Sequence, residues 1–324
     1  MPGRRIGGRA VSRPRSGGGG RAKRGGGRAK GASRGGGASR GSGSSRGGGS
    51  SRGAGAPRLG AGDRPRAARP ATKASRDSLG GTQVEGRQAV RELLLAGRRR
   101  VHQVLIATDV DSGDVIDDIV MLAGDRGVPI RRVPRRDLDR DARSEAPQGV
   151  LARAEEIPET DLADLVATDD GPPFVVAVDG VTDPGNLGAI LRCCEAAGVR
   201  GVVLPRHRAV HVTPTVAKAA AGAAEYVSMA LVAGLPTALR QMKEAGLWIV
   251  GLDDGGSTSL FELGTLAREP LCLVLGAEGA GLSRLVRERC DQVVGIPMAG
   301  SLSSLNVSAA AALAVFEVVR SRRA

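Results

Sequence analysis

The sequence predicts an α/β protein whose larger domain contains a doubly wound parallel sheet, and three observations lead to this prediction. Two nearly continuous apolar runs, 174–178 and 271–275, are typical of strands buried on both faces of a sheet. Segments with helical spacing alternate with such strands from Phe174 onward. Three loops rich in Gly, Pro and Asn each follow a buried strand, where ligands of such sheets usually bind.

A smaller α/β unit of about 70 residues precedes this domain. Apolar residues at helical spacing predict a first helix that ends at Gly97, and they are Val84, Ala89, Val90, Leu93 and Leu94. The other expected elements of this unit are strands at 101–107, 128–133 and 148–152 and a helix at 115–123.

The larger domain follows an acidic, proline-containing linker in which we expect one short helix, at 161–167. Its strands are expected at 174–178, 202–204, 247–251, 271–275 and 292–296, with a further short segment at 226–229. Its helices are expected at 187–197, 213–222, 235–245, 282–289 and 306–320.

Charge is distributed very unevenly along the chain. Residues 1–78 hold 20 basic and two acidic residues, a net charge of +18, whereas the other 246 residues hold 27 basic and 32 acidic ones, a net charge of −5. The same stretch has 23 of the 49 glycines and no aromatic residue, so it has too little apolar surface to offset its ordering entropy. We therefore expect a disordered Arg/Gly-rich tail at 1–80, a small domain at 81–153, a linker at 154–173 and the large domain at 174–324.

Several classes of protein are excluded by composition. No apolar stretch approaches the ~18–20 residues of a membrane span, and no apolar segment follows the basic start as in a secretory signal. The four cysteines form no C-x-x-C pair and the three histidines are scattered, so we expect no metal site and a reducing, cytoplasmic setting. The tail shares its Arg and Ser content with a mitochondrial transit peptide, although its glycines disfavour the amphipathic helix of such peptides. An overlong gene start is a second alternative for the tail.

The three strand-end loops carry the candidate chemistry. They span 179–192, 275–283 and 296–308. The glycine loop of the second segment lacks the lysine of a phosphate-binding Walker loop, and its G-x-x-G-x-G spacing is a poor dinucleotide fingerprint. Taken singly, each loop also has a structural interpretation: a tight turn for the glycines, helix N-caps for Asn186 and Asn306, and a solvated or Glu195-paired side chain for Arg192.

Together the loops resemble the three motifs of the SpoU-type (TrmH-like) RNA ribose 2′-O-methyltransferases of the SPOUT superfamily. The matching patterns are D-x-x-x-D-P-x-N-x-G-A-I-x-R, L-G-x-E-G-x-G-L and I-P-M-x-G-x-x-x-S-L-N-V-S, in the family's order. The segment 84–90, V-E-G-R-Q-A-V, resembles the start of the family's small L30e-like substrate-binding domain. The nearest resemblance is to the branch that methylates a guanosine ribose in the peptidyl-site loop of 23S rRNA.

The resemblance implies a fold and a set of site residues. It implies a trefoil-knotted catalytic domain, a homodimer, and S-adenosylmethionine as the methyl donor without a metal. Carried over by position, the cofactor-binding residues are Gly276, Ala277, Ile296, Met298 and Leu305, and the catalytic residues are Arg192, Asn186, Glu278 and Asn306.

RNA binding is expected to depend on arginines, because the chain from Ala154 onward is net acidic. The candidate RNA-binding residues of the small domain are Arg98, Arg99, Arg100, Arg131 and Arg132. The expected partner is 23S rRNA or a precursor of the large ribosomal subunit, with no membrane involved. Alternatives are a different RNA target such as tRNA or the thiopeptide-resistance site of rRNA, an RNA chaperone that has lost its active site, and, more remotely, a dinucleotide-dependent oxidoreductase.

Overall fold

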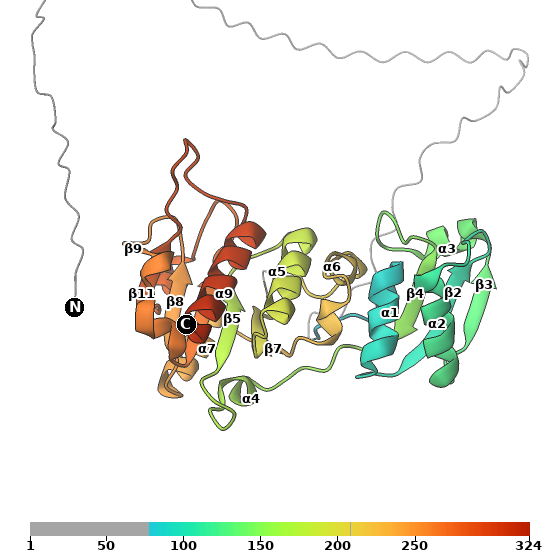
Figure 1. Cartoon of the computed structure of the whole chain (residues 1–324), viewed down its shortest axis with the longest axis horizontal. Helices are drawn as coiled ribbons and strands as arrows, with labels where there is room; N and C mark the ends of the chain where they lie inside the picture. The colour runs from blue at the N-terminus through green and yellow to red at the C-terminus, as the bar shows by residue number, and fades with distance from the viewer. Residues whose placement is uncertain (1–77, 208) are drawn as a thin grey trace, which may run out of the picture. The chain divides into compact units, whose positions relative to one another are not determined.

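The computed structural model describes residues 78–207 and 209–324, all of which belong to one compact unit, Ala67–Ala324. Figure 1 shows this part of the chain with its helices and strands labelled. The tail expected at 1–80 lies outside the described residues, apart from its last three positions.

The small domain is a four-stranded sheet with the strand order β1-β4-β2-β3. The strands β1 and β4 and the strands β2 and β4 are antiparallel, whereas β2 and β3 are parallel. Its elements are β1 (Gln83–Glu85), α1 (Arg87–Ala96), β2 (Val101–Ala107), α2 (Asp114–Asp125), β3 (Ile130–Val133), α3 (Arg135–Asp141) and β4 (Val150–Ala154). The expected helix does end at Gly97, which has the left-handed φ of 61°. Helix α3 was not predicted.

Val84 was assigned to the first helix, and this prediction is wrong: Val84 lies in β1 and pairs with Ala152 of β4. The next residue, Glu85, is fully buried, which a strand ending at the sheet edge permits and a solvated first turn does not. Its carboxylate accepts the backbone N–H of Arg143 (2.7 Å) and of Ser144 (2.9 Å), and also the side-chain amide of Gln83 (2.6 Å). The carboxylate therefore fixes the loop that leads into β4.

The large domain contains a seven-stranded sheet with the order β7-β6-β5-β10-β8-β11-β9, and every neighbouring pair is parallel. The predicted doubly wound parallel sheet is thus confirmed. Its strands are β5 (Phe174–Val178), β6 (Gly201–Pro205), β7 (Met229–Val232), β8 (Trp248–Leu252), β9 (Thr258–Ser259), β10 (Leu271–Leu275) and β11 (Gln292–Gly295). The short segment expected at 226–229 overlaps β7 only at Met229, and β9 was not predicted.

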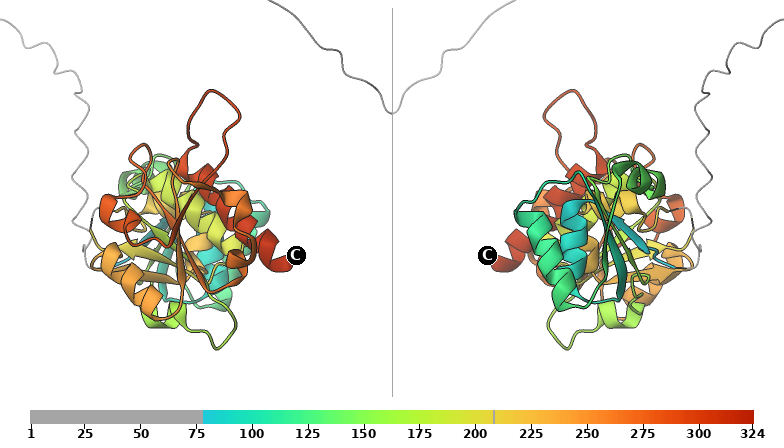
Figure 2. Two further views of the ribbon diagram at one scale, coloured as in Figure 1. Left: turned by 90° about the vertical axis from the view of Figure 1, so that its left-hand side faces the viewer. Right: turned by 90° about the vertical axis from the view of Figure 1, so that its right-hand side faces the viewer.

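Helices cover both faces of this sheet (Figure 2). They are α4 (Leu162–Val166), α5 (Pro184–Ala196), α6 (Pro214–Ala219), α7 (Leu235–Glu244), α8 (Arg284–Arg287) and α9 (Val307–Arg323). Alternate residues of the central strand β10 enter two separate apolar clusters: Leu273 packs with residues of α5 and α9, and Val274 with residues of α7 and α8. Burial on both faces explains why the strands read as continuous apolar runs.

Two asparagines were expected as helix N-caps, but only one of them is an N-cap in the structure. Asn306 does cap α9, because its side-chain oxygen accepts the N–H of Ser308 at 2.9 Å. The prediction for Asn186 is wrong: Asp183 caps α5 by accepting the N–H of Asn186 at 2.7 Å, and Asn186 lies in the first turn. Pro184, at the first helical position, extends the helix one turn earlier than apolar spacing predicts. Within 78–207 and 209–324, no helix is both long and apolar enough to cross a membrane.

Candidate active site

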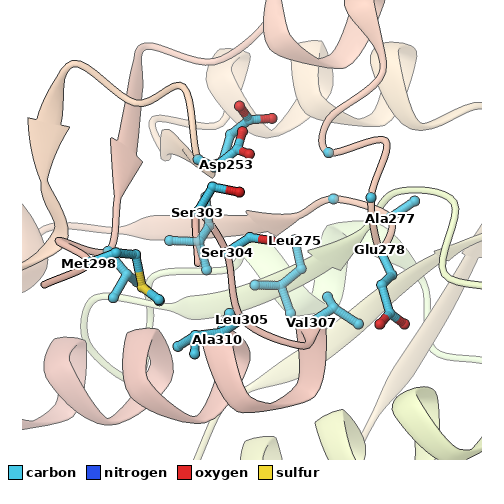
Figure 3. A pocket seen from close by; sticks show the side chains of 16 residues that line it. Asp253, Leu275, Ala277, Glu278, Met298, Ser303, Ser304, Leu305, Val307 and Ala310 are labelled. Atoms are coloured by element: carbon cyan, nitrogen blue, oxygen red, sulfur yellow. The ribbon is translucent and has the colours of Figure 1, made fainter. Parts of the chain in front are cut away.

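A pocket opens at the carboxyl ends of β8, β10 and β11, where three loops meet (Figure 3). The five residues expected to hold a cofactor all line it, namely Gly276, Ala277, Ile296, Met298 and Leu305. They come from the glycine loop after β10, from the segment after β11 and from the approach to α9. Segments that are about 20 residues apart in sequence therefore share one hollow, as the order of parallel strands requires.

The glycine loop forms one wall of this pocket. Ala277 and Gly281 exchange two backbone hydrogen bonds of 2.9 Å, which close a tight turn. A Cβ atom on Gly276 would lie 2.4 Å from the carbonyl carbon of Gly281, so the two limbs of the loop approach too closely for any side chain. Gly279 and Gly281 have positive φ angles of 75° and 63°. The glycines are thus required by the turn that shapes the pocket.

The opposite wall is apolar. Leu305, Val307 and Ala310 lie along the start of α9, and Met298 lies beside them (Figure 3). An adenine nucleoside needs a flat apolar slot with backbone donors and acceptors at its edge. A glycine loop that exposes its backbone, facing a wall of aliphatic side chains, fits that requirement.

Three of the four predicted catalytic side chains form a connected polar chain at the rim of the pocket. The Asn186 amide nitrogen donates to Glu278 Oε2 at 3.1 Å, and the Asn306 amide nitrogen donates to Asn186 Oδ1 at 3.0 Å. Asn186 is 9% exposed, so its amide has a defined orientation, whereas Glu278 and Asn306 are exposed. These hydrogen bonds join residues from all three loops. Glu278 and Asn186 therefore do more than stabilise the loop to which each belongs.

Arg192 is placed differently. It does not line the pocket, and it lies six residues after Asn186 on α5, which corresponds to a different face of that helix. Its side chain is exposed, and it makes no hydrogen bond or ion pair with any described residue. Of the four residues that the resemblance implies as catalytic, Arg192 is therefore the one that the structure of a single chain does not bring to the pocket.

Asp253 is a residue of the site that the sequence analysis missed. It directly follows β8, lines the pocket, and has a side chain that is only 7% exposed. Burial alone raises the pKa of this carboxyl, but hydrogen bonds from the N–H groups of Leu282 and Gly255 and from Arg287 outweigh burial and hold the pKa below its usual value. Its position immediately after a buried strand was the available signal, and it is the same signal that singled out the three loops.

Two of the predicted RNA-binding arginines make hydrogen bonds within the chain, Arg99 as a buried residue and Arg98 as an exposed one. Arg99 is 9% exposed and forms a bidentate ion pair with Glu225, with N···O distances of 2.9 and 2.6 Å. Its remaining nitrogen donates to the carbonyls of Gly81, at 2.6 Å, and of Glu155. Arg98 donates to the carbonyl of Tyr226 at 2.7 Å.

These contacts also place the two arginines far from the pocket along the sheet. Glu225 and Tyr226 lie a few residues before β7, at the amino end of a parallel sheet whose carboxyl end holds the pocket. Arg100, Arg131 and Arg132 are exposed. Arg131 and Arg132 lie on β3, an edge strand, where charged side chains also oppose unwanted strand pairing.

The described residues offer neither a cluster of metal ligands nor an activated thiol. No group of three or more His, Cys, Asp or Glu side chains among them is arranged to hold a metal ion. Burial raises the pKa of the Cys194 and Cys272 thiols, which disfavours the nucleophilic thiolate.

Comparison with known proteins matches both domains. The model of the SpoU rRNA methylase family matches residues 173–316, and the model for RNA 2′-O ribose methyltransferase substrate binding matches residues 83–160. A 23S rRNA (guanosine-2′-O-)-methyltransferase, RlmB of Escherichia coli, is 40% identical over 242 residues, which cover 74% of this chain and 98% of RlmB. The chain belongs to the SpoU rRNA methylase family.

Two further relatives bear on what this SpoU enzyme does. A protein of Mycolicibacterium smegmatis named as an uncharacterized tRNA/rRNA methyltransferase is 40% identical over 272 residues, covering 80% of this chain and 86% of the relative. The crystal structure of the SpoU methyltransferase AviRb from Streptomyces viridochromogenes in complex with AdoMet is 27% identical, with a TM-score of 0.62, and covers 74% of this chain and 90% of AviRb. The SpoU chain is accordingly an RNA 2′-O-ribose methyltransferase whose methyl donor is S-adenosylmethionine.

Proposed function

We propose that the enzyme methylates the ribose 2′-hydroxyl of a guanosine in 23S rRNA, in the peptidyl-site loop, as a free RNA or within a precursor of the large subunit. The name of the 40%-identical RlmB supports the guanosine and the 23S rRNA, and the motif resemblance supports the loop. The single observation that carries the chemistry is the Glu278–Asn186–Asn306 chain at the rim of the pocket. An RNA chaperone with a lost active site would have no use for this connected set.

S-adenosylmethionine supplies an electrophilic methyl group for an in-line displacement by the ribose oxygen. In the proposal, Gly276, Ala277, Ile296, Met298 and Leu305 hold the donor through backbone groups and apolar contacts. The three linked polar side chains orient the ribose, and such alignment alone supplies several kcal/mol of the barrier. The apolar wall excludes water from the methyl group.

Arg192 acts, in this proposal, on the RNA rather than on the donor. A guanidinium holds its proton too tightly to serve as a general base. Its exposed position, free of intramolecular partners among the described residues, leaves its planar fork available to a phosphate next to the target ribose and to the developing alkoxide. The hydroxyl proton then leaves through that phosphate or a water molecule.

The proposal includes a homodimer with a knotted catalytic domain, working in the cytoplasm, with Arg100, Arg131, Arg132 and the basic residues of 1–78 contributing to RNA attraction. Support for self-association comes from α9, where Leu313 and Phe316 are 44% and 46% exposed and lie on one face of the helix. That helix packs against α5, which carries Arg192, so a second copy seated on α9 would lie close to this arginine.

The test is site mapping of the product. Purified enzyme is incubated with S-adenosylmethionine and with 23S rRNA, precursor particles or tRNA, and 2′-O-methylation is located by nuclease digestion and mass spectrometry. The expected result is methylation of one guanosine in the peptidyl-site loop. The same methylation is expected to be absent from the rRNA of a strain that lacks the gene. Methylation of tRNA, or of a different rRNA position, would contradict the proposal while leaving the family assignment intact.

A further inference from the structure

The carboxylate of Asp253 links the end of β8 to the glycine loop. The backbone N–H of Asp253 donates to Val294 of β11 at 3.0 Å, which fixes the residue in the sheet. Its Oδ2 accepts the N–H of Leu282, at the base of the glycine loop, at 2.9 Å. The loop is thus tied to a strand that is not its own.

The same carboxylate is held from the other side. Oδ1 accepts the N–H of Gly255 at 3.0 Å and Nη1 of Arg287 at 2.6 Å, and Nη2 of Arg287 donates to the carbonyl of Gly255 at 2.9 Å. The side chain of Asp253 is 7% exposed although Arg287 is 42% exposed, so three protein donors rather than solvent surround the carboxylate. The carboxylate has one defined position.

The glycine loop is built to accept this contact. A Cβ atom on Gly281 would lie 2.5 Å from Asp253 Oδ2, so only glycine lets the loop approach the carboxylate. Leu282 is 7% exposed and packs into the cluster below the sheet, where a Cβ on Gly251 would meet its side chain at 2.6 Å. Together, the hydrogen bond to the Leu282 amide and the buried Leu282 side chain fix the end of the loop that forms the pocket wall.

We infer that Asp253, held by Arg287, is a positioning residue for the methyl donor: it fixes the glycine loop through the Leu282 amide in the conformation that receives S-adenosylmethionine. This inference rests on the assignment of the pocket to the methyl donor. Its effect belongs to donor affinity rather than to RNA binding or to the chemical step.

The strand β8 offers a matched control at its other end. The carboxylate of Asp291 accepts the N–H of Ile249 at 2.8 Å and pairs with Lys243 at 2.7 Å, so it also ties a backbone amide to a basic side chain. Asp291 does not line the pocket. Asp253→Asn and Asp291→Asn therefore remove similar charged hydrogen bonds from the two ends of one strand.

The experiment measures S-adenosylmethionine binding to the full-length variants by isothermal titration calorimetry. Asp253→Asn is expected to weaken binding about tenfold, since it loses a charged hydrogen bond and places an amide N–H₂ among three donors. Asp291→Asn is expected to stay within twofold. Amide hydrogen exchange of Leu282 in the ligand-free enzyme is expected to accelerate only in Asp253→Asn. In steady-state kinetics the same variant is expected to raise KM for the donor, with kcat and RNA affinity nearly unchanged.

Equal affinity of Asp253→Asn and wild type, or equal losses in both variants, would overturn the inference. Should Asp253→Asn fail to fold, Arg287→Met provides a second measurement, with an expected loss of about threefold through a less firmly held carboxylate; an unchanged affinity there also contradicts the inference. A wild-type enzyme that binds no S-adenosylmethionine would instead refute the assignment of the pocket.

Discussion

Two arginines of the described chain show how differently the same residue type is used. Arg99 has a side chain that is 3% exposed, and it joins Glu225 with the carbonyls of Gly81 and Glu155. Arg192 is exposed and makes no hydrogen bond with the described residues. Arg99 lies in a run of three arginines and Arg192 in an apolar helical segment, and only Arg192 is available to a ligand.

The difference teaches that burial with full pairing marks a structural arginine, whereas an exposed arginine without an intramolecular partner is a candidate for function. Arg99 connects the start of the small domain, the linker and the segment before β7, so it holds the two domains together. Removing either partner of such a pair leaves a buried charge without compensation. An exposed arginine carries no such penalty, so its loss reports on function.

The largest effect on stability is expected for Arg99→Met. The substitution leaves Glu225 buried and unpaired, and it should lower the free energy of unfolding by about 3–5 kcal/mol, measured by urea denaturation. The double variant Arg99→Met/Glu225→Leu should recover much of the loss. Removal of the exposed Arg240–Glu244 pair on α7 serves as the control and should cost less than about 1 kcal/mol. A similar loss of unfolding free energy for both pairs would contradict the distinction between buried and exposed arginines.

For Arg192→Ala we expect a loss of activity without a loss of stability. Methyl transfer should fall about 10²–10³-fold, as when one donor to a developing oxyanion is removed, while S-adenosylmethionine affinity and thermal stability stay near wild type. Single-turnover kinetics with RNA and calorimetry with the donor measure the two quantities. Arg240→Ala is the control. Full activity of Arg192→Ala would show that the exposed arginine has no part in the reaction.

Asn306→Ala should produce an intermediate effect on both properties. It removes the cap of α9, worth about 1 kcal/mol, and the hydrogen bond to Asn186. Thr213→Ala removes the cap of α6, where Thr213 accepts the N–H of Val216, and should cost similar stability. Activity should fall about tenfold only in Asn306→Ala, since only this cap belongs to the polar chain. Equal activities would reduce Asn306 to a capping residue.

The smallest effect is expected for Arg98→Ala. Its guanidinium binds backbone carbonyls at the amino end of the sheet, so RNA affinity measured by filter binding should change less than twofold. Arg132→Ala, which removes an exposed arginine of β3, should weaken binding more and reduce its dependence on salt. The opposite order would restore Arg98 as an RNA contact.

The sequence predicted best those elements that are decided locally. The strands 101–107, 174–178 and 271–275 have the expected bounds, and the last two are continuous apolar runs that begin directly after a proline. The residues expected to hold the cofactor were carried over from the family resemblance, and the structure brings them together in one pocket. The family membership, expected from the three motifs, is confirmed.

Errors arose where a distant partner decides the outcome. Val84 reads as helical until its pairing with Ala152 is known, and Arg99 reads as a solvated cation until Glu225, 126 residues later, is brought beside it. Asp253 was missed because its importance depends on the amide of Leu282 from another strand-end loop. Such contacts have no local signature in the sequence.

The position of β10 has a consequence for how the polypeptide is made. This strand lies between β5 and β8, although β6, β7 and β8 all leave the ribosome before it. The small domain has all four strands once Ala154 is synthesised, whereas β5 and β8 keep unpaired inner edges until Leu275 emerges. Open edges of this kind invite association between nascent chains, and such late pairings are slow to form. The longest vulnerable interval in biosynthesis therefore falls on the domain that performs catalysis.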